Sequence, residues 1–75
     1  MAKLPSIRAR QVVRIAELIG FIFDRQRGIH AVYYRASDNR RVVIPMHGTK
    51  DLKPGTHRGI INDMGLTVEE FAEKI

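Results

Sequence analysis

The sequence predicts an α+β fold in which a three-stranded antiparallel sheet packs against two helices, followed by a short third helix. Apolar residues recur at helical spacing within the first twenty residues. Three runs rich in β-branched and aromatic residues follow, separated by short polar turns, and a second helical pattern comes after them. Placing both main helices on one face of the sheet is the economical way to bury their apolar stripes.

The first helix is expected to begin after Ser6, whose hydroxyl can accept a hydrogen bond from a free amide of the first turn. It is expected to end at Gly20, because glycine readily adopts the left-handed conformation that closes a helix. One face of this helix is apolar, formed by Val12, Ile15, Ala16 and Ile19.

Three strands are expected to follow as a meander. The predicted strands span residues 21–26, 30–36 and 41–44. Arg27 and Gly28 predict the first turn, and the Ser, Asp and Asn residues of the segment 37–39 are typical of a hairpin turn, which is the second. Pro45 marks the end of the third strand or an edge position.

A polar loop, residues 47–55, leads into the second helix, which opens around Pro54 to Thr56 and runs through Met64. Gly65 is expected to end it. Thr67 and Glu70 form a T-x-x-E capping box for a final helix through Phe71. We expect residues 1–75 to form a single domain. Its layout resembles the double-stranded-RNA-binding domain, a likeness of fold that does not fix function.

The charge distribution favours a polyanionic partner. The chain has 13 basic and 8 acidic residues, and all the basic residues except Lys74 lie in residues 1–58. Nine of the basic residues are arginines, whose guanidinium groups suit bidentate phosphate contacts. The partner could be a nucleic acid or an acidic protein, and the other interpretation is an ordinary solvated basic surface.

Several classes of protein are disfavoured. The chain contains no cysteine, and its three histidines have neither helical i, i+4 spacing nor Cys neighbours, so we expect no metal site. A core of this size leaves little room for a deep pocket, and we expect no cofactor. No apolar run approaches the roughly 20 residues of a membrane helix. A cytoplasmic protein without membrane association is therefore expected.

Five strings follow one another along the chain: Gly20-Phe21, RQRGIH (25–30), RRVVIPMH (40–47), KPGT (53–56) with Ile60-Ile61, and residues 65–71. Together they resemble one family of small toxins, the HicA-like (YcfA-type) mRNA interferases. Gly20-Phe21 resembles the exit of the family's first helix, and RQRGIH (25–30) resembles its R-Q-K-G-S-H signature. RRVVIPMH (40–47) is similar to its R-x-V-x-V-P-x-H strand. KPGT (53–56) with Ile60-Ile61 resembles the start of its second long helix, and residues 65–71 its C-terminal signature. The similarity covers nearly the whole chain without a large insertion.

This resemblance implies the toxin of a type II toxin–antitoxin pair, cleaving mRNA without a metal and held inactive by a HicB-like antitoxin. It places the catalytic histidine at His30, and we expect the free toxin to be a monomer. Two positions depart from the pattern. Ile29 stands where the family usually has Ser or Gly, and Ala31 where it often has a second His.

An imidazole with an ordinary pKa near 6.5 suits proton transfer at neutral pH, so His30 is expected to act as general base or general acid. RNA supplies the nucleophile, its 2′-hydroxyl, and the expected product is a 2′,3′-cyclic phosphate. The candidate phosphate-binding residues flank His30 or precede the second helix, and they are Arg25, Arg27, Arg35, Lys50 and Lys53.

Four other residues have weaker assignments. Tyr33 and Tyr34 point to opposite faces of their strand, so one should pack on the helices while the other could stack on a base. His47 is expected to be structural or to position substrate, and His57 to be exposed.

Two further hypotheses stay open. One is a non-catalytic RNA-binding module of the same fold, with Ile29 marking lost activity. The other is a protein-interaction domain whose basic face meets an acidic partner, which predicts weak RNA affinity that collapses with moderate salt.

Overall fold

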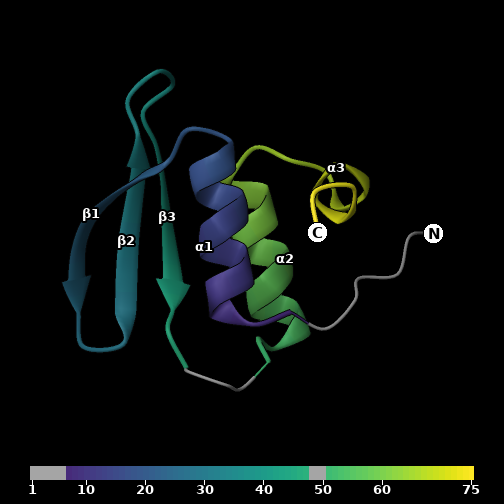
Figure 1. The fold of residues 1–75 in the computed structure, drawn as a ribbon, viewed down its shortest axis with the longest axis horizontal. Helices are drawn as coiled ribbons and strands as arrows, with labels where there is room; N and C mark the ends of the chain where they lie inside the picture. Colours follow the sequence, from purple (N-terminus) through teal and green to yellow (C-terminus); the bar gives the residue numbers. More distant parts are fainter. Residues whose placement is uncertain (1–6, 48–50) are drawn as a thin grey trace.

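The computed structural model describes residues 7–47 and 51–75. The elements, in chain order, are α1 (Ala9–Leu18), β1 (Ile22–Arg27), β2 (His30–Arg35), β3 (Arg40–Pro45), α2 (Pro54–Asp63) and α3 (Val68–Ala72) (Figure 1). This order confirms the expected α+β fold and the expected meander. The likeness to the double-stranded-RNA-binding domain rests on this order alone and stays a prediction.

The sheet has the order β1-β2-β3, with both neighbouring pairs antiparallel. A bulge between Phe23 and Arg25 shifts the register of β1 against β2. The turns contain the residues with positive φ, Gly28 at 58° and Asn39 at 56°. A side chain other than Gly or Asn would strain at either position, which is why these turns close where the sequence predicted.

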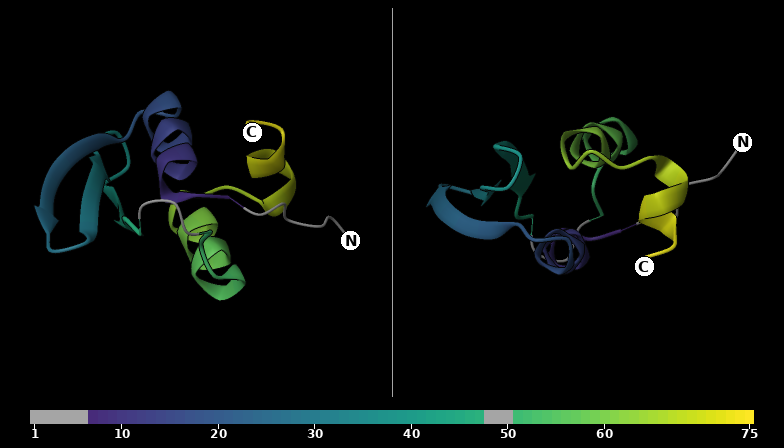
Figure 2. Two further views of the ribbon diagram at one scale, coloured as in Figure 1. Left: turned by 60° about the horizontal axis from the view of Figure 1, so that its bottom comes forward. Right: turned by 90° about the horizontal axis from the view of Figure 1, so that it is seen from above.

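The helices α1 and α2 cover the same face of this sheet, as Figures 1 and 2 show. The covered face is the one that bears Tyr33 and Ala31 of β2, paired with Val42 and Ile44 of β3. The helices contribute their predicted apolar stripes to the same core, namely Val12, Ile15 and Ala16 from α1 and Ile60, Ile61 and Met64 from the α2 end. By alternation, the opposite face of β2 bears His30, Val32 and Tyr34.

The helix α1 begins at Ala9, with Arg8 in the N-cap position, where its amide donates to Gln11 Oε1 at 2.9 Å. The predicted cap, Ser6, lies outside the described residues. At the other end Gly20 has φ of 100°, and the amide of Phe21 donates to the carbonyl of Ala16 at 3.0 Å. Gly20 therefore reverses the chain into β1 as predicted.

The C-terminal half also follows the sequence signals. Pro54 occupies the first turn of α2, and Gly65, with φ of 81°, follows its end. The Thr67 hydroxyl accepts from the Glu70 amide at 3.1 Å, and the Glu70 carboxylate accepts from the Thr67 amide at 2.8 Å. This capping box starts α3, whose Phe71 is fully buried in the core.

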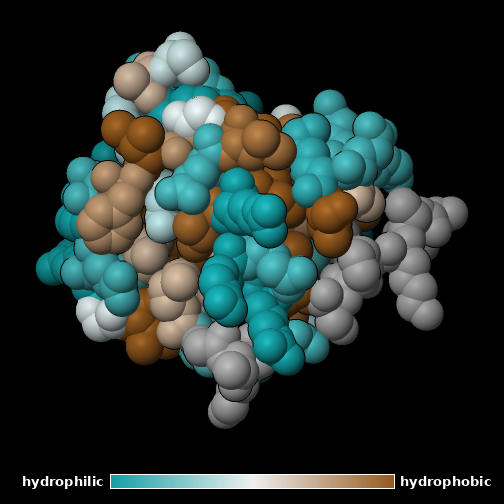
Figure 3. Space-filling view, in the orientation of Figure 1, coloured by the Kyte–Doolittle hydropathy of each residue, from teal (hydrophilic) through white to brown (hydrophobic). Residues whose placement is uncertain are grey.

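Apolar residues reach the surface in several separate places on the face drawn in Figure 3. Among the described residues, the large apolar side chains that are exposed come from five parts of the fold, and they are Leu18, Ile22, Phe23, Ile29, Val43 and Ile75. Within the described part of the chain, no helix combines the length and the apolar character needed to cross a membrane.

Candidate functional site

His30 is the first residue of β2 and is exposed to solvent. It follows the tight turn at Gly28 and pairs with Arg27 of β1 on one side and Pro45 of β3 on the other. Because the helices cover the face that carries Ala31 and Tyr33, His30 lies on the open face at the end of the sheet. A histidine in this place can be reached by a large substrate.

A hollow of about 460 Å³ joins this end of the sheet to the start of α2. Its wall comes from the ends of β2 and β3 and from the segment that leads into α2, and the lining residues are His30, Pro45, His47, Asp51, Leu52, Lys53 and Thr56. The chain leaving β3 is fixed here because the Met46 amide donates to the Ile29 carbonyl at 2.6 Å. The fold thus brings His30, His47 and Lys53, which are distant in sequence, to one hollow.

The N-terminus of α2 forms one wall of this hollow. Lys53 is its N-cap and Pro54 follows it, and no side chain among the described residues caps the first turn. The amides of a first helical turn have no partner within the helix, and the helix dipole makes this end positive. In this turn Pro54 has no amide hydrogen and the His57 amide donates to the Lys53 carbonyl, which leaves the amides of Gly55 and Thr56. A phosphate group in the hollow would lie near Lys53 and Thr56.

One negative charge also lies in the hollow. Asp51 is half-exposed and pairs with Arg8 at 3.8 Å between carboxylate and guanidinium. The same two residues form an isolated antiparallel bridge, and the Leu52 amide donates to the Ile7 carbonyl at 2.9 Å. These contacts connect the segment before α1 to the segment before α2, and they fix Asp51 and Leu52, which line the hollow.

The predicted arginines fall into two groups. Arg27 is paired directly beside His30, and Arg25 lies one rung further along the same face, with its guanidinium 3.0 Å from Asp24. Arg35 lies at the far end of β2, on the covered face. Its guanidinium donates to the Ile19 carbonyl at 2.8 Å and the Met64 carbonyl at 3.3 Å, and it also pairs with Asp38.

The structure therefore groups Arg27 and Arg25 with His30 but gives Arg35 partners within the protein. Lys53 lies in the hollow, whereas Lys50 lies outside the described residues. None of these phosphate contacts has been tested, and each stays a prediction.

The expectation that His57 is exposed was wrong. His57 is only 3% exposed, and its ring meets Phe71 edge-on with 5.1 Å between centroids. Its spacing to Ile60, Ile61 and Met64 puts it on the buried stripe of α2, a signal that the sequence does contain. Burial lowers the pKa of this imidazole, and the neighbouring Arg58 charge lowers it further.

The two tyrosines separate as the alternation predicted. Tyr33 is buried in the core and meets Phe23 edge-on, and burial together with the Glu17 charge raises its pKa. Tyr34 is half-buried on the open face, where the guanidinium of Arg41 lies 5.7 Å from its ring centre. Sequence reasoning missed Arg41 as a functional candidate, although its place opposite Tyr34 follows from the register of β2 and β3.

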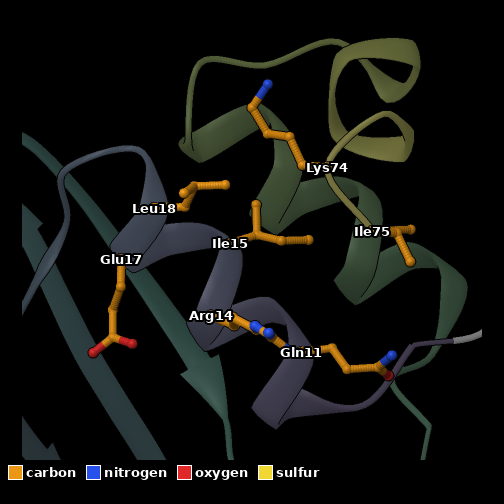
Figure 4. A pocket seen from close by; sticks show the side chains of 7 residues that line it. All are labelled: Gln11, Arg14, Ile15, Glu17, Leu18, Lys74 and Ile75. Carbon is orange, nitrogen blue, oxygen red and sulfur yellow. The ribbon is translucent and has the colours of Figure 1, made fainter.

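A second hollow of about 680 Å³ lies between α1 and the C-terminal residues (Figure 4). Leu18 and Ile75 point toward it, together with the long side chains of Arg14 and Lys74. It contains no histidine and none of the predicted phosphate contacts. Within the described ranges, no three His, Asp or Glu side chains gather as a metal ion would require.

Residues 9–66 match the family described as the HicA toxin of bacterial toxin–antitoxin systems. The chain belongs to the HicA toxin family. HicA toxins are mRNA interferases, and each pairs with an antitoxin. The matched residues span α1 through the turn after α2, so they include His30 and the whole hollow around it. No curated protein matches the chain.

Proposed function

We propose that this HicA-family toxin is a metal-independent endoribonuclease that cleaves mRNA with His30 as its proton-transfer group. The observation that carries the proposal is the hollow in which an exposed histidine meets a lysine and the N-terminus of a helix. Such a site combines an imidazole, which can accept and donate protons, with positive charge for an anion.

In the proposed reaction the 2′-oxygen of one nucleotide bonds to the adjacent phosphorus, and the bond from phosphorus to the 5′-oxygen breaks. A base takes the proton of the 2′-hydroxyl, and an acid gives a proton to the departing 5′-oxygen. The products are a 2′,3′-cyclic phosphate and a free 5′-hydroxyl. His30 performs one of these two transfers.

The surrounding residues would stabilise the charge that develops on the phosphate. Lys53 and Thr56 line the hollow at the start of α2, and Arg27 pairs beside His30. Charged donors held at fixed positions stabilise a transition state without reorganising at the moment of reaction. His47 lines the same hollow, and we assign it a substrate-positioning role.

Ile29 is 45% exposed beside His30 and offers no hydroxyl to a phosphate. The Lys53 ammonium and the Thr56 hydroxyl belong to residues that line the same hollow and can donate to a phosphate. The proposal therefore does not require a hydroxyl at position 29.

Expression of the native chain and of His30→Ala in bacterial cells tests this function. The native chain should arrest growth and fragment mRNA, and the variant should do neither. Because His30 is exposed at a strand end, the variant should melt at the native temperature, which serves as the control for folding. Intact mRNA and normal growth with a soluble native chain would instead favour a binding module that shifts RNA mobility without shortening the RNA.

A further inference from the structure

The open face of the sheet has a regular arrangement that the cleavage site alone does not use. Three rungs cross it, each with one residue from every strand. They are Arg27–His30–Pro45, Arg25–Val32–Val43 and Ile22–Tyr34–Arg41. Successive rungs lie about 6.6 to 6.8 Å apart, because two residues separate them along β2. His30 and Tyr34 therefore stand at opposite ends of the face, about 13 Å apart along the strand.

The arginines of this face differ from the others of the sheet in their partners. Among the described residues, Arg27 and Arg41 make no ion pair and no side-chain hydrogen bond. Arg35 and Arg40, on the covered face, both pair with Asp38 and reach the carbonyls of helix ends. Arg25 pairs with Asp24, the acidic residue at the bulge. The free guanidinium groups thus occur where a polyanion could reach them.

The last rung also carries an aromatic surface. Tyr34 is held in place because its hydroxyl donates to Asn39 Oδ1 in the β2–β3 turn. Its ring is half-buried between Ile22, which is 66% exposed, and Arg41, whose guanidinium lies 5.7 Å from the ring centre. An aromatic ring held by a hydrogen bond, beside an apolar side chain and a guanidinium group without an ion pair among the described residues, is suited to stacking on a nucleobase.

We propose that Tyr34, Arg41 and Ile22 form a base-binding subsite for single-stranded RNA, whose backbone runs past Arg25 and Arg27 to His30. This inference rests on the proposed ribonuclease function, since it places RNA at His30. A base on Tyr34 belongs to a nucleotide near the scissile phosphate but outside the hollow. A ring on the sheet face can stack only on a base that is not stacked within a duplex, so a single strand is the expected substrate.

The affinity of the His30→Ala chain for a short fluorescent single-stranded RNA, measured by anisotropy, tests the subsite without cleavage of the probe. In that background Tyr34→Leu should weaken binding about tenfold, as expected for the loss of one stacked base. Tyr34→Phe keeps the ring and should stay within about twofold of the parent. Arg41→Ala should weaken binding and lower the dependence of log Kd on log salt by about one.

Arg40→Ala is the matched control, because Arg40 neighbours Arg41 in β3 but lies on the covered face beside Asp38. It should change RNA affinity by less than about twofold. Equal losses in Arg40→Ala and Arg41→Ala would overturn the subsite, since they would indicate a general charge effect. Unchanged affinity in Tyr34→Leu would also overturn it, as would tighter binding of a duplex than of the single strand. If the open face binds only an acidic protein and no RNA base, Tyr34→Leu would likewise leave the affinity for RNA unchanged.

These outcomes are separable from failure of the proposed function. If the native chain does not cleave RNA, the subsite still predicts that Tyr34→Leu binds less tightly than Tyr34→Phe. If the native chain cleaves RNA and Tyr34→Leu binds and cleaves RNA as the native chain does, the ribonuclease function is supported and the base-binding subsite is refuted.

Discussion

Arg35 joins three parts of the fold, and its removal should destabilise the protein strongly. From the end of β2 its guanidinium reaches the carbonyls of Ile19 and Met64, which are the C-cap residues of α1 and α2. It also lies 4.5 Å from the ring centre of buried Phe21. Its side chain is only 19% exposed. The predicted perturbation is Arg35→Met, which keeps the apolar stem and removes the charge and the donors.

The expected loss follows from these contacts. A charged hydrogen bond to a carbonyl contributes about 1.5 to 3 kcal/mol, and the 2.8 Å bond to Ile19 has suitable geometry. The 3.3 Å bond to Met64 should contribute at the low end of that range or below it. The cation–π contact with Phe21 adds about 1 kcal/mol. Since these contributions overlap, we expect a total loss of about 3 kcal/mol.

Chemical denaturation of the native chain, Arg35→Met and Arg41→Met measures this loss. A chain of this size should have about 4 to 11 kcal/mol of stability, so the Arg35 variant should lose a large part of it. Its melting temperature should fall by about 12 to 24 °C. Arg41→Met, on the open face, should lose less than about 1 kcal/mol.

The neighbouring carboxyl gives a second measurement. The hydrogen bond from Arg35 lowers the pKa of Asp38 from 3.8 to about 2, and this pKa should return toward its ordinary value in Arg35→Met. A variant within about 0.5 kcal/mol of the native stability would refute the structural role of Arg35. If that variant also bound RNA weakly, the original prediction of Arg35 as a phosphate contact would be supported instead.

Three further predictions concern stability. His57 has a lowered pKa in the folded protein, so the unfolded chain binds a proton at this residue more readily than the folded chain does. The free energy of unfolding should therefore fall as pH drops below about 6.5. Denaturation curves of His57→Leu at several pH values should lack this dependence. Gly59→Ala should stabilise the protein by about 0.5 to 1 kcal/mol, because Gly59 lies in mid-helix and nothing lies within 4 Å of the added Cβ. Gly65→Ala should instead destabilise it by at least about 1 kcal/mol, because φ is 81° and the Arg40 guanidinium would lie 2.9 Å from the added Cβ. Equal melting temperatures for the two variants would contradict both expectations. Thr67→Ala should cost about 1 kcal/mol through loss of the α3 cap, and an unchanged melting temperature would refute it.

Much of the fold could be predicted because each element carries its own local signal. Gly20, Gly28 and Gly65 all have positive φ where the sequence indicated turns or helix ends, and Thr67 caps the helix that its spacing to Glu70 predicted. These signals depend on neighbours only a few residues away, so they can be read without knowledge of the tertiary structure.

Features that depend on tertiary contacts were less accessible. Arg35 was assigned from its charge and from its place near His30 in sequence, but which face of β2 it occupies depends on where the helices pack. His57 was expected to be exposed because it matches none of the family strings, although its spacing on α2 marks it as buried. The hollow joins His30 to Lys53 across a gap of more than twenty residues in sequence, and no local pattern indicates that proximity.

Cleavage of a defined single-stranded RNA by the purified chain, in the presence of EDTA, tests the central claim most directly. The account predicts fragments with 2′,3′-cyclic phosphate and 5′-hydroxyl ends, absent with His30→Ala and absent when the nucleotide 5′ of the cleavage site is 2′-deoxy. Cleavage at the full native rate by His30→Ala would contradict it, and so would cleavage of the deoxy-substituted RNA at that same position.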